Sequence, residues 1–495
     1  MTPSGHFRVH FDRRGRHAVP VDDSDGNGVP DYVDRVAVAA DSAWILEVET
    51  LGYRPPPGDS GQGGGSEYDL YLVQMSTVGG GQYYGLTYPE GAGTTSGSYI
   101  EIDNDFQEAT YTSTRGLQAM RVTVAHEFFH AIQFGYYQGT DGIWWQEAAS
   151  TWMEDVAYPE VDDYLQYLSS FLLHPEKALD GGNRFATDFR IYGASIWAHF
   201  LDQRYGRSTI RLIWEEMGRH SSASMEQFDR VLQDQDRASL GAAVSQFAVW
   251  NYFTGTRSRP GYYVEGWKYP EVRVEDVHID PGAPEVPAER SLSIDHLGSA
   301  YVRLQPDLLS GGVTLDYSGD ERSSWSRQLI LVGRDSVTVR GVAAKPVVVP
   351  SWDRFDDIVL VLTVTSDTGF GYNSDIAVAY DPDLLGEPAP QALRLQPSYP
   401  NPFRLERDAL TTFHFDLNEP SPVTFLSVFG ADGRLVRRFA MGGLAARQGH
   451  TQTWDGTNEA GETVASGIYL GVLEASGRHV RTTLAVIRGS GSAQR

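Results

Sequence analysis

The hydrophobic pattern of this 495-residue chain changes twice along its length, and these changes constrain the fold more than any single residue does. In the first hundred residues, alternating apolar side chains predict strands at 6–11, 68–73 and 99–102, with a helix over 33–51. From about residue 115 to 253 the apolar residues recur at helical spacing, and after that the alternation typical of strands returns. A chain this long exceeds one ordinary hydrophobic core, so the pattern indicates several domains.

We predict a multidomain protein in which an α+β domain precedes two all-β sandwich domains. The expected helices of the middle region are 118–137, 143–156, 161–173, 192–204 and 240–252. The predicted divisions are an α+β domain at 1–270, a β-sandwich at 285–385, a Pro-rich linker at 386–402 and a C-terminal β-sandwich at 403–490. The middle sandwich carries no recognisable motif, so substrate binding and simple spacing are equally open as its role.

The chain is acidic, with 65 Asp and Glu against 40 Lys and Arg and a formal net charge of −25. Such a surface repels phosphate backbones, so we expect no nucleic-acid partner. The sequence has no cysteine, which excludes disulfides, thiolate zinc ligands and a cysteine nucleophile. No apolar run has the length of a transmembrane helix. The first residues, MTPSGH, lack the features of a signal peptide. If the protein is exported, we expect that its leader has been removed.

The segment VAHEFFHA lies within a helical pattern and carries the residues that indicate chemistry. His126 and His130 are four residues apart, so they lie one turn apart on the same helix face and both rings can reach one metal ion. Glu127 lies beside them, where a carboxylate can accept a proton from a metal-bound water. The pattern has only three fixed positions, so it can also arise by chance. The alternative interpretation is a helix surface with two incidental histidines.

A catalytic zinc ion needs a third protein ligand and an open fourth position. The next predicted helix contains Glu147, 17 residues after His130, in the apolar surroundings WWQEAASTWME. A carboxylate on such a face needs a partner, and Glu147 lies in the first turns of its helix, so Glu147 is the expected third ligand. Glu154, two turns later, is the competing ligand. Alternatively, Glu154 or Thr151 forms a hydrogen bond to the histidines from outside the metal site.

Together, HEFFHAIQ and WWQEAASTWME resemble the gluzincin metallopeptidases, and residues 4–257 resemble a bacterial family of secreted neutral zinc metallopeptidases. The flanking stretches SYIEIDNDF, WMEDVAY and VDDYLQYL are part of the second resemblance. The resemblance implies a gluzincin-like zincin fold, zinc at His126, His130 and Glu147, and Glu127 as the general base. The interval between His130 and Glu147 is shorter than in gluzincin aminopeptidases, so exopeptidase specificity is not carried over.

A tyrosine or histidine that stabilises the tetrahedral oxyanion usually completes such a site. The stretch RIYGASIWAHFL opens a predicted helix and resembles the helix that carries the catalytic tyrosine in aminopeptidase-type gluzincins. This resemblance implies a catalytic role for Tyr192. A half-buried tyrosine that caps a core helix is the alternative interpretation.

The loop DSDGNGVPDYVD near the start has oxygen donors at positions 1, 3, 5, 9 and 12 and glycine at position 6, an arrangement that binds one calcium ion. Aspartate at position 12 resembles the loops of extracellular modules, and a solvated acidic turn is the alternative. We expect a structural Ca²⁺ that fixes the N-terminal strand to the domain. The expected ligands are Asp23, Asp25, Asn27, Val29 through its carbonyl, Asp31 and Asp34.

The last part of the chain contains YPNPF, VFGADG, WDG and GIY in this order. The order resembles the Ig-like domains that end many exported bacterial proteins, including type IX secretion sorting domains and flagellar-hook-cap Ig-like modules. The resemblance implies export and an association of this domain with secretion machinery or the cell surface.

We therefore expect a secreted or cell-surface zinc-dependent endopeptidase that acts on protein or peptide substrates, with catalytic Zn²⁺ and structural Ca²⁺. One alternative is a cell-surface adhesin or binding protein with a degenerate or structural zinc site. Another is a non-peptide amidase that uses the same residues. Glu127 favours an enzyme, since a purely structural zinc site needs no proton acceptor.

Overall fold

The structure is a computed structural model, and the chain forms two compact units. The first comprises Met1–His174, Leu179–Ala243 and Lys268–Val272, and the second comprises Pro175–Ala178, Val244–Trp267 and Arg273–Arg495. The structure describes residues 1–58, 61–78, 83–108, 111, 113–182, 189–279, 287–304, 311–333, 336–342, 345–384, 393–417, 421–444 and 447–488, except for the side chains of 447–449. Among these residues, no helix has both the length and the apolar character needed to span a membrane.

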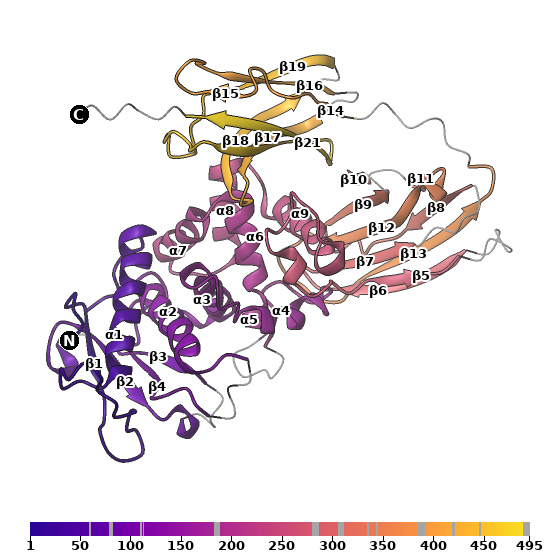
Figure 1. The fold of residues 1–495 in the computed structure, drawn as a ribbon. Coiled ribbons are helices and arrows are strands. Elements are labelled where there is room, and N and C mark those ends of the chain that lie inside the picture. The colour runs from indigo at the N-terminus through magenta and orange to yellow at the C-terminus, as the bar shows by residue number, and fades with distance from the viewer. Residues whose placement is uncertain are drawn as a thin grey trace. The chain divides into compact units, whose positions relative to one another are not determined.

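A four-stranded sheet begins the first unit (Figure 1). It consists of β1 (Phe7–His10), β2 (Tyr68–Val73), β3 (Gly85–Pro89) and β4 (Ser98–Asp103), in the order β1-β2-β4-β3. β1, β2 and β4 run parallel, and β3 pairs antiparallel with β4 at the edge. The apolar alternation buries Leu70, Leu72, Ile100 and Ile102, and helix α2 (Gly116–Phe134) packs on β3 and β4.

Helices α2 and α3 (Ile143–Ala157) pack against each other and form the centre of the first unit. Every residue of α2 from Val122 to Phe134 is buried, which the continuous apolar run around its few polar residues explains. The other helices are α1 (Asp31–Trp44) followed by a π-helical turn at Ile45–Thr50, α4 (Leu165–Leu172), α5 (Arg190–Gly193), α6 (Ser195–Tyr205), α7 (Ser208–His220) and α8 (Met225–Asp236).

Most predicted helices of the first unit are present, with ends that differ by a few residues. The predicted helix at 192–204 is divided, because α5 ends at Gly193 and α6 starts at Ser195. Helices α7 and α8 lie outside the predicted helices. Their signal is real but weak, because the apolar residues of α7 at 210, 213, 214 and 217 are interspersed with charges.

The second unit contains a β-sandwich in its middle part (Figure 1). One sheet contains β5 (Glu275–Val277), β7 (Ser299–Leu304), β9 (Trp325–Gly333), β10 (Val337–Gly341) and β12 (Phe355–Val364). The other contains β6 (Ala288–Ile294), β8 (Gly312–Tyr317), β11 (Val347–Val349) and β13 (Tyr372–Asp381). Apolar residues of both sheets, together with Trp352, fill the space between them.

A second sandwich follows toward the C-terminus. Its larger sheet contains β17 (Ser421–Gly430), β18 (Leu435–Leu444), β20 (Gly467–Ala475) and β21 (Arg478–Ile487), with the short β15 (Phe403–Arg404) beside β21. These strands continue the β5–β12 sheet of the middle sandwich, because β21 pairs with β10 at Arg478 and Thr338. Its smaller sheet contains β14 (Arg394–Leu395), β16 (Thr411–Leu417) and β19 (Arg447–Trp454). The buried side chains of Phe413, Phe415 and Trp454 lie in the core between them.

The predicted order of a mixed N-terminal region followed by β-sheet domains is confirmed. The first unit does not extend to residue 270 as one segment, because Val244–Trp267 belongs to the second unit. Most of helix α9 (Leu240–Tyr252) lies in that segment. The helix is bonded to the middle sandwich, because the hydroxyl of Tyr301 on β7 donates to the carbonyl of Ala248 at 2.8 Å. An apolar helix in a sequence does not reveal which core it joins. Residues 386–392 of the predicted linker lie outside the described residues.

Candidate metal centre

Three buried polar side chains of α2 and α3 converge in the first unit. His126 and His130 come from α2 and Glu147 from α3, and their exposed fractions are 8%, 3% and 2%. The four-residue spacing of the histidines brings both rings to the side of α2 that meets Glu147. Among the described residues, these three form one of the few groups whose ligand atoms all lie within 4.8 Å of one another.

The three ligand atoms have the spacing of a tetrahedral zinc site. Nε2 of His126 lies 3.1 Å from Nε2 of His130, and each Nε2 lies 3.4 Å from Oε2 of Glu147. A tetrahedral zinc ion with ligand bonds of about 2.0–2.1 Å holds its ligand atoms about 3.3–3.4 Å apart. Three corners of such a tetrahedron would therefore coincide closely with these atoms.

Outer hydrogen bonds determine which ring nitrogen faces the cluster. Nδ1 of His126 lies 2.6 Å from Oε1 of Glu154, and Nδ1 of His130 lies 2.9 Å from Oε1 of Gln133. The amide nitrogen of Gln133 donates to Ser150 Oγ at 3.0 Å and to a backbone carbonyl of α3 at 3.1 Å, so its oxygen is the atom left for His130. Each Nδ1 faces an acceptor and carries the hydrogen, which leaves a lone pair on each Nε2.

The electrostatics of this cluster favour a cation. Two nitrogen lone pairs and a carboxylate oxygen at these separations repel one another unless positive charge lies between them. Burial lowers the pKa of His126, but its hydrogen bonds to Glu147 and Glu154 outweigh burial and hold this pKa well above its usual range, so in the metal-free chain a proton on His126 supplies that charge. Two imidazoles and one carboxylate are also a donor set of catalytic zinc sites. The residues present therefore fit a zinc ion.

The two glutamates of α3 that compete as third ligand occupy different places. Glu147 faces the Nε2 atoms of both histidines, whereas Glu154 faces the other nitrogen of His126. Burial raises the pKa of Glu154 to about 7, although its hydrogen bond to His126 lowers it. The hydroxyl of Thr151 has no hydrogen-bond partner among the described residues. This geometry favours Glu147 as the ligand and Glu154, not Thr151, as the outer partner.

Glu127 is positioned by strand β3. The hydroxyl of Thr87 lies 2.7 Å from Oε2 of Glu127 and 2.9 Å from its backbone oxygen. Gly85 leaves room for the glutamate, because a Cβ at this position would lie 2.8 Å from Glu127 Cγ and 2.8 Å from Thr123 Cγ2. Neither Thr87 nor Gly85 is predicted from the sequence. The Gly-rich stretch GGGQYYG reads as a loop, and the LTY run after it is too short to predict a strand.

Tyr192 lies beside the histidines on α5. Its ring centroid is 6.3 Å from that of His126 and 5.2 Å from that of Tyr167 on α4. Gly193 permits this close packing of α5 on α4, because a Cβ there would lie 2.6 Å from the carbonyl oxygen of Tyr167. All five residues predicted for the zinc site thus lie in one region, while the catalytic role of Tyr192 stays a prediction.

The predicted calcium loop lies before α1 and is exposed. Asp23, Asp25 and Asp31 each offer one carboxylate oxygen within 4.8 Å of the others. The side-chain nitrogen of Asn27 donates to Oδ2 of Asp25 at 3.1 Å and to Oδ2 of Asp34 at 3.0 Å. The structure therefore brings the five predicted side-chain donors together in one loop.

The rest of the loop connects these donors to the sheet. Gly26 has a φ of 71°, a conformation that glycine adopts easily and other residues rarely do. The backbone N–H of Val29 donates to Oδ1 of Asn27 at 2.6 Å, and the hydroxyl of Tyr32 donates to the carbonyl of Asp103 on β4 at 2.8 Å. The loop thus leads directly into a helix that is bonded to the sheet, as a structural role would require.

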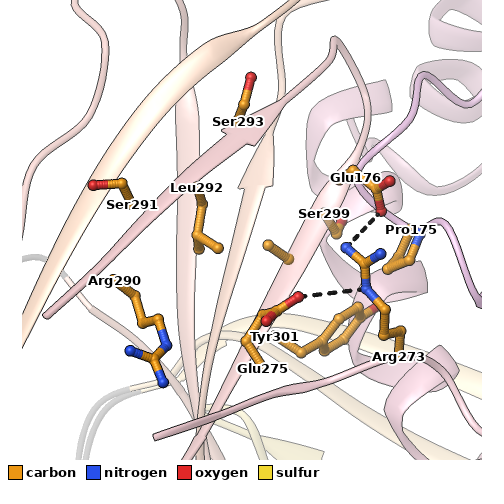
Figure 2. Close-up of a pocket in the computed structure, with 11 residues that line it drawn as sticks. Pro175, Glu176, Arg273, Glu275, Arg290, Ser291, Leu292, Ser293, Ser299 and Tyr301 are labelled. Atoms are coloured by element: carbon orange, nitrogen blue, oxygen red, sulfur yellow. Dashed lines mark hydrogen bonds and ion pairs between the residues drawn. The ribbon is translucent and has the colours of Figure 1, made fainter. Parts of the chain in front are cut away.

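The middle sandwich contains a cavity of about 230 Å³, lined by residues of β5, β6 and β7 (Figure 2). Arg273 lies in its wall and pairs with Glu176 at 3.2 Å and with Glu275 at 3.4 Å. Arg290 donates to two backbone carbonyls, those of Glu289 and Asp276. Because both guanidinium groups already have acceptors in the wall, the cavity does not indicate a ligand, and the role of this domain stays open.

One protein family matches part of the chain. Residues 401–478 match the FlgD Ig-like domain family, so the C-terminal sandwich is an Ig-like module. This match confirms the Ig-like part of the resemblance seen in the sequence. It does not extend to the first unit, whose zinc-peptidase resemblance stays a prediction. A search of curated proteins found no significant match.

Similar solved structures share little with this chain as a whole. PorZ, a surface component of the type-IX secretion system of Porphyromonas gingivalis, is 15% identical over 32% of this chain and 22% of its own, with a TM-score of 0.16. Dimeric latent PorU from Porphyromonas gingivalis is 12% identical over 44% of this chain and 19% of its own, with a TM-score of 0.17. CopC from Methylosinus trichosporium OB3b is 18% identical over 20% of this chain and 98% of its own, with a TM-score of 0.15. The chain spans about a fifth of PorZ and PorU, and likenesses with such TM-scores carry no argument about function.

Proposed function

We propose that the protein is a zinc-dependent endopeptidase whose first unit is a zincin catalytic domain of the gluzincin type. The observation that carries this proposal is the convergence of His126, His130 and Glu147 at tetrahedral spacing, with Glu127 next to them on α2. A structural zinc site needs four protein ligands, whereas a catalytic site keeps one position open. Three converging donors and an adjacent carboxylate support the catalytic type.

The residues of the site would divide the work as follows. His126, His130 and Glu147 would hold the zinc ion, which would act as a Lewis acid and make water acidic enough to react near neutral pH. Glu127 would accept the proton of the attacking water on its carboxylate and pass it to the leaving amine. Tyr192 would donate a hydrogen bond to the oxygen that becomes negative in the transition state.

Strand β3 supports a peptide as substrate rather than a small amide. β3 is the edge strand of its sheet, and among the described residues no strand pairs with its outer side. An extended peptide can add to such an edge through backbone hydrogen bonds. The same strand holds Glu127 through Thr87, so a peptide bound along β3 would pass close to the general base.

The remaining features support an exported protein. The acidic composition and the C-terminal Ig-like module fit a protein that acts outside the cell or on its surface. In this proposal the Ig-like module associates with secretion machinery or with the cell surface. The loop at 23–34 would bind a structural Ca²⁺ through Asp23, Asp25, Asn27, Val29, Asp31 and Asp34.

Cleavage of casein and of a fluorogenic peptide library by the zinc-loaded protein tests the proposal. The Glu127→Gln variant is the matched control, because the amide keeps the size of the side chain but cannot accept the proton. We expect the wild type to cleave peptides and the variant to lose at least about a hundredfold in turnover while retaining zinc. Equal behaviour of the two proteins would refute the peptidase and favour a binding protein with a structural zinc site. Hydrolysis of small amides alone would indicate a non-peptide amidase.

A further inference from the structure

An aromatic patch, defined here as Tyr167, Phe189 and Tyr192, borders the metal centre. The ring centroid of Tyr192 lies 6.3 Å from that of His126. Tyr167 lies 5.2 Å from Tyr192, and Phe189 lies 5.9 Å from Tyr167 and 6.3 Å from Tyr192. The patch is therefore a series of ring contacts that begins at a proposed zinc ligand and ends at Phe189.

Phe189 has a backbone conformation and a side-chain exposure that do not stabilise the folded chain. Its backbone has φ 53° and ψ 20°, the left-handed region that bulky side chains disfavour. Its side chain is also 53% exposed, although it is a large apolar ring. Strained residues of this kind gather at ligand sites, where the surrounding structure holds them in place.

The surroundings of Phe189 hold this strained conformation firmly. Its carbonyl oxygen accepts hydrogen bonds from the N–H groups of Tyr192 and Gly193, at 3.1 and 3.0 Å, and from the hydroxyl of Ser170 at 3.0 Å. The next residue, Arg190, is 1% exposed and donates to the carbonyl of His174 at 3.1 Å. The ring of Phe189 is thus presented to solvent by a rigid turn.

The polar groups near the patch also disfavour an acidic ligand. Burial, followed by the charges of Asp163 and Glu154, raises the pKa of Tyr167 well above its usual range, so its phenol is neutral. A carboxylate brought to this place would meet the like charge of Asp163. An apolar side chain would instead cover the exposed ring of Phe189 and gain contact with the aromatic edges around it.

We propose that Phe189, with Tyr167 and Tyr192, forms the specificity subsite of this centre and binds a large apolar side chain next to the scissile bond of a peptide. The inference rests on the proposed peptidase function and adds its substrate class, peptides with an aromatic or long aliphatic residue at one position flanking the cleaved bond. Phe189 is the residue that determines this preference.

The test uses fluorogenic peptides that differ only in the residue on either side of the cleaved bond, with phenylalanine, leucine, alanine or aspartate at each position. For the zinc-loaded wild type, we expect phenylalanine and leucine at one of the positions to raise kcat/KM at least about tenfold over alanine, with aspartate lowest. In Phe189→Gly the ratio of phenylalanine to alanine peptides should fall to within about twofold, chiefly through loss with the phenylalanine peptide. Phe370→Ala, at a ring that is 71% exposed in the middle sandwich, is the matched control and should keep the wild-type ratio.

Thermal unfolding separates a specificity role from a structural one. Glycine adopts the left-handed region without strain, so Phe189→Gly should unfold at the same or a higher temperature than the wild type. A lower unfolding temperature together with an equal loss on all peptides would assign Phe189 to the fold and overturn the inference. Cleavage with an unchanged preference in Phe189→Gly would overturn the subsite alone. No cleavage by the zinc-loaded wild type would overturn the proposed function and, with it, the subsite.

Discussion

The outer contact between Glu154 and His126 gives the sharpest quantitative prediction. Glu154→Gln preserves the size of the side chain and an oxygen that can accept from Nδ1 of His126, but it removes the negative charge. In the structure this carboxylate approaches His126 at 2.6 Å, and its other oxygen is buried with no hydrogen-bond partner among the described residues. The substitution therefore alters one contact, the one that orients His126 and raises its basicity.

The expected magnitude follows from this contact. Loss of such an outer partner typically lowers metal affinity about 10- to 100-fold, or about 1.4–2.7 kcal/mol of binding free energy. The pKa of Glu154, which burial raises to about 7, adds a second test of this contact, the dependence of zinc affinity on pH. In the metal-free protein the wild-type carboxyl becomes neutral below pH 7, as the amide is, so the difference in zinc affinity between the two proteins should shrink as the pH falls.

Competition with a chromophoric chelator, at pH 8 and again at pH 6, measures the two zinc dissociation constants. Glu226→Gln, at a residue whose side chain is 62% exposed on α8, is the matched control and should bind zinc like the wild type. A dissociation constant of Glu154→Gln within twofold of the wild type at pH 8, with an intact fold by circular dichroism, would refute the outer-partner role.

Four further predictions concern other parts of the molecule. Burial lowers the pKa of His199 to about 3, so at acidic pH the unfolded chain binds a proton that the folded chain excludes. The free energy of unfolding should therefore be highest above pH 6.5 and fall by about 3 kcal/mol by pH 4. Urea unfolding should find a smaller fall in His199→Gln. Gly85→Ala should displace Glu127 and lower turnover while zinc content stays at one ion per chain, and full activity would contradict the contact. Tyr192→Phe should lower turnover by about an order of magnitude with zinc retained, and unchanged turnover would remove Tyr192 from the site. EGTA should lower the unfolding temperature of the wild type by a few degrees, and a melting curve indifferent to EGTA would contradict the calcium loop at 23–34.

Local spacing explains why much of the candidate metal centre could be predicted from the sequence. His126, Glu127 and His130 share one helix, so helical periodicity alone relates their side chains. Glu147 and Glu154 are harder to distinguish, because they lie seven residues, or about two turns, apart on the same helix. Only the packing of α3 on α2 determines which of them faces both Nε2 atoms.

Contacts across long sequence distances account for what the sequence does not reveal. Thr87 and Glu127 are 40 residues apart in the sequence. Their contact depends on the packing of α2 on an edge strand whose residues show no strong strand pattern. The left-handed backbone of Phe189 has no signature in its residue type, because glycine or asparagine would be the ordinary choice there. The division near Val244 depends on which core the apolar helix α9 joins, and periodicity cannot distinguish between two cores.

Zinc K-edge X-ray absorption of the zinc-loaded wild type, combined with metal analysis, tests the central claim most directly. We expect one zinc ion per chain, bound by two imidazole nitrogens and oxygen ligands at about 2.0–2.1 Å, and loss of this signal in Glu147→Ala. Two results would contradict a catalytic zinc centre at His126, His130 and Glu147. One is a protein that retains no zinc after dialysis. The other is a spectrum that shows a different number of imidazoles and is unchanged in Glu147→Ala.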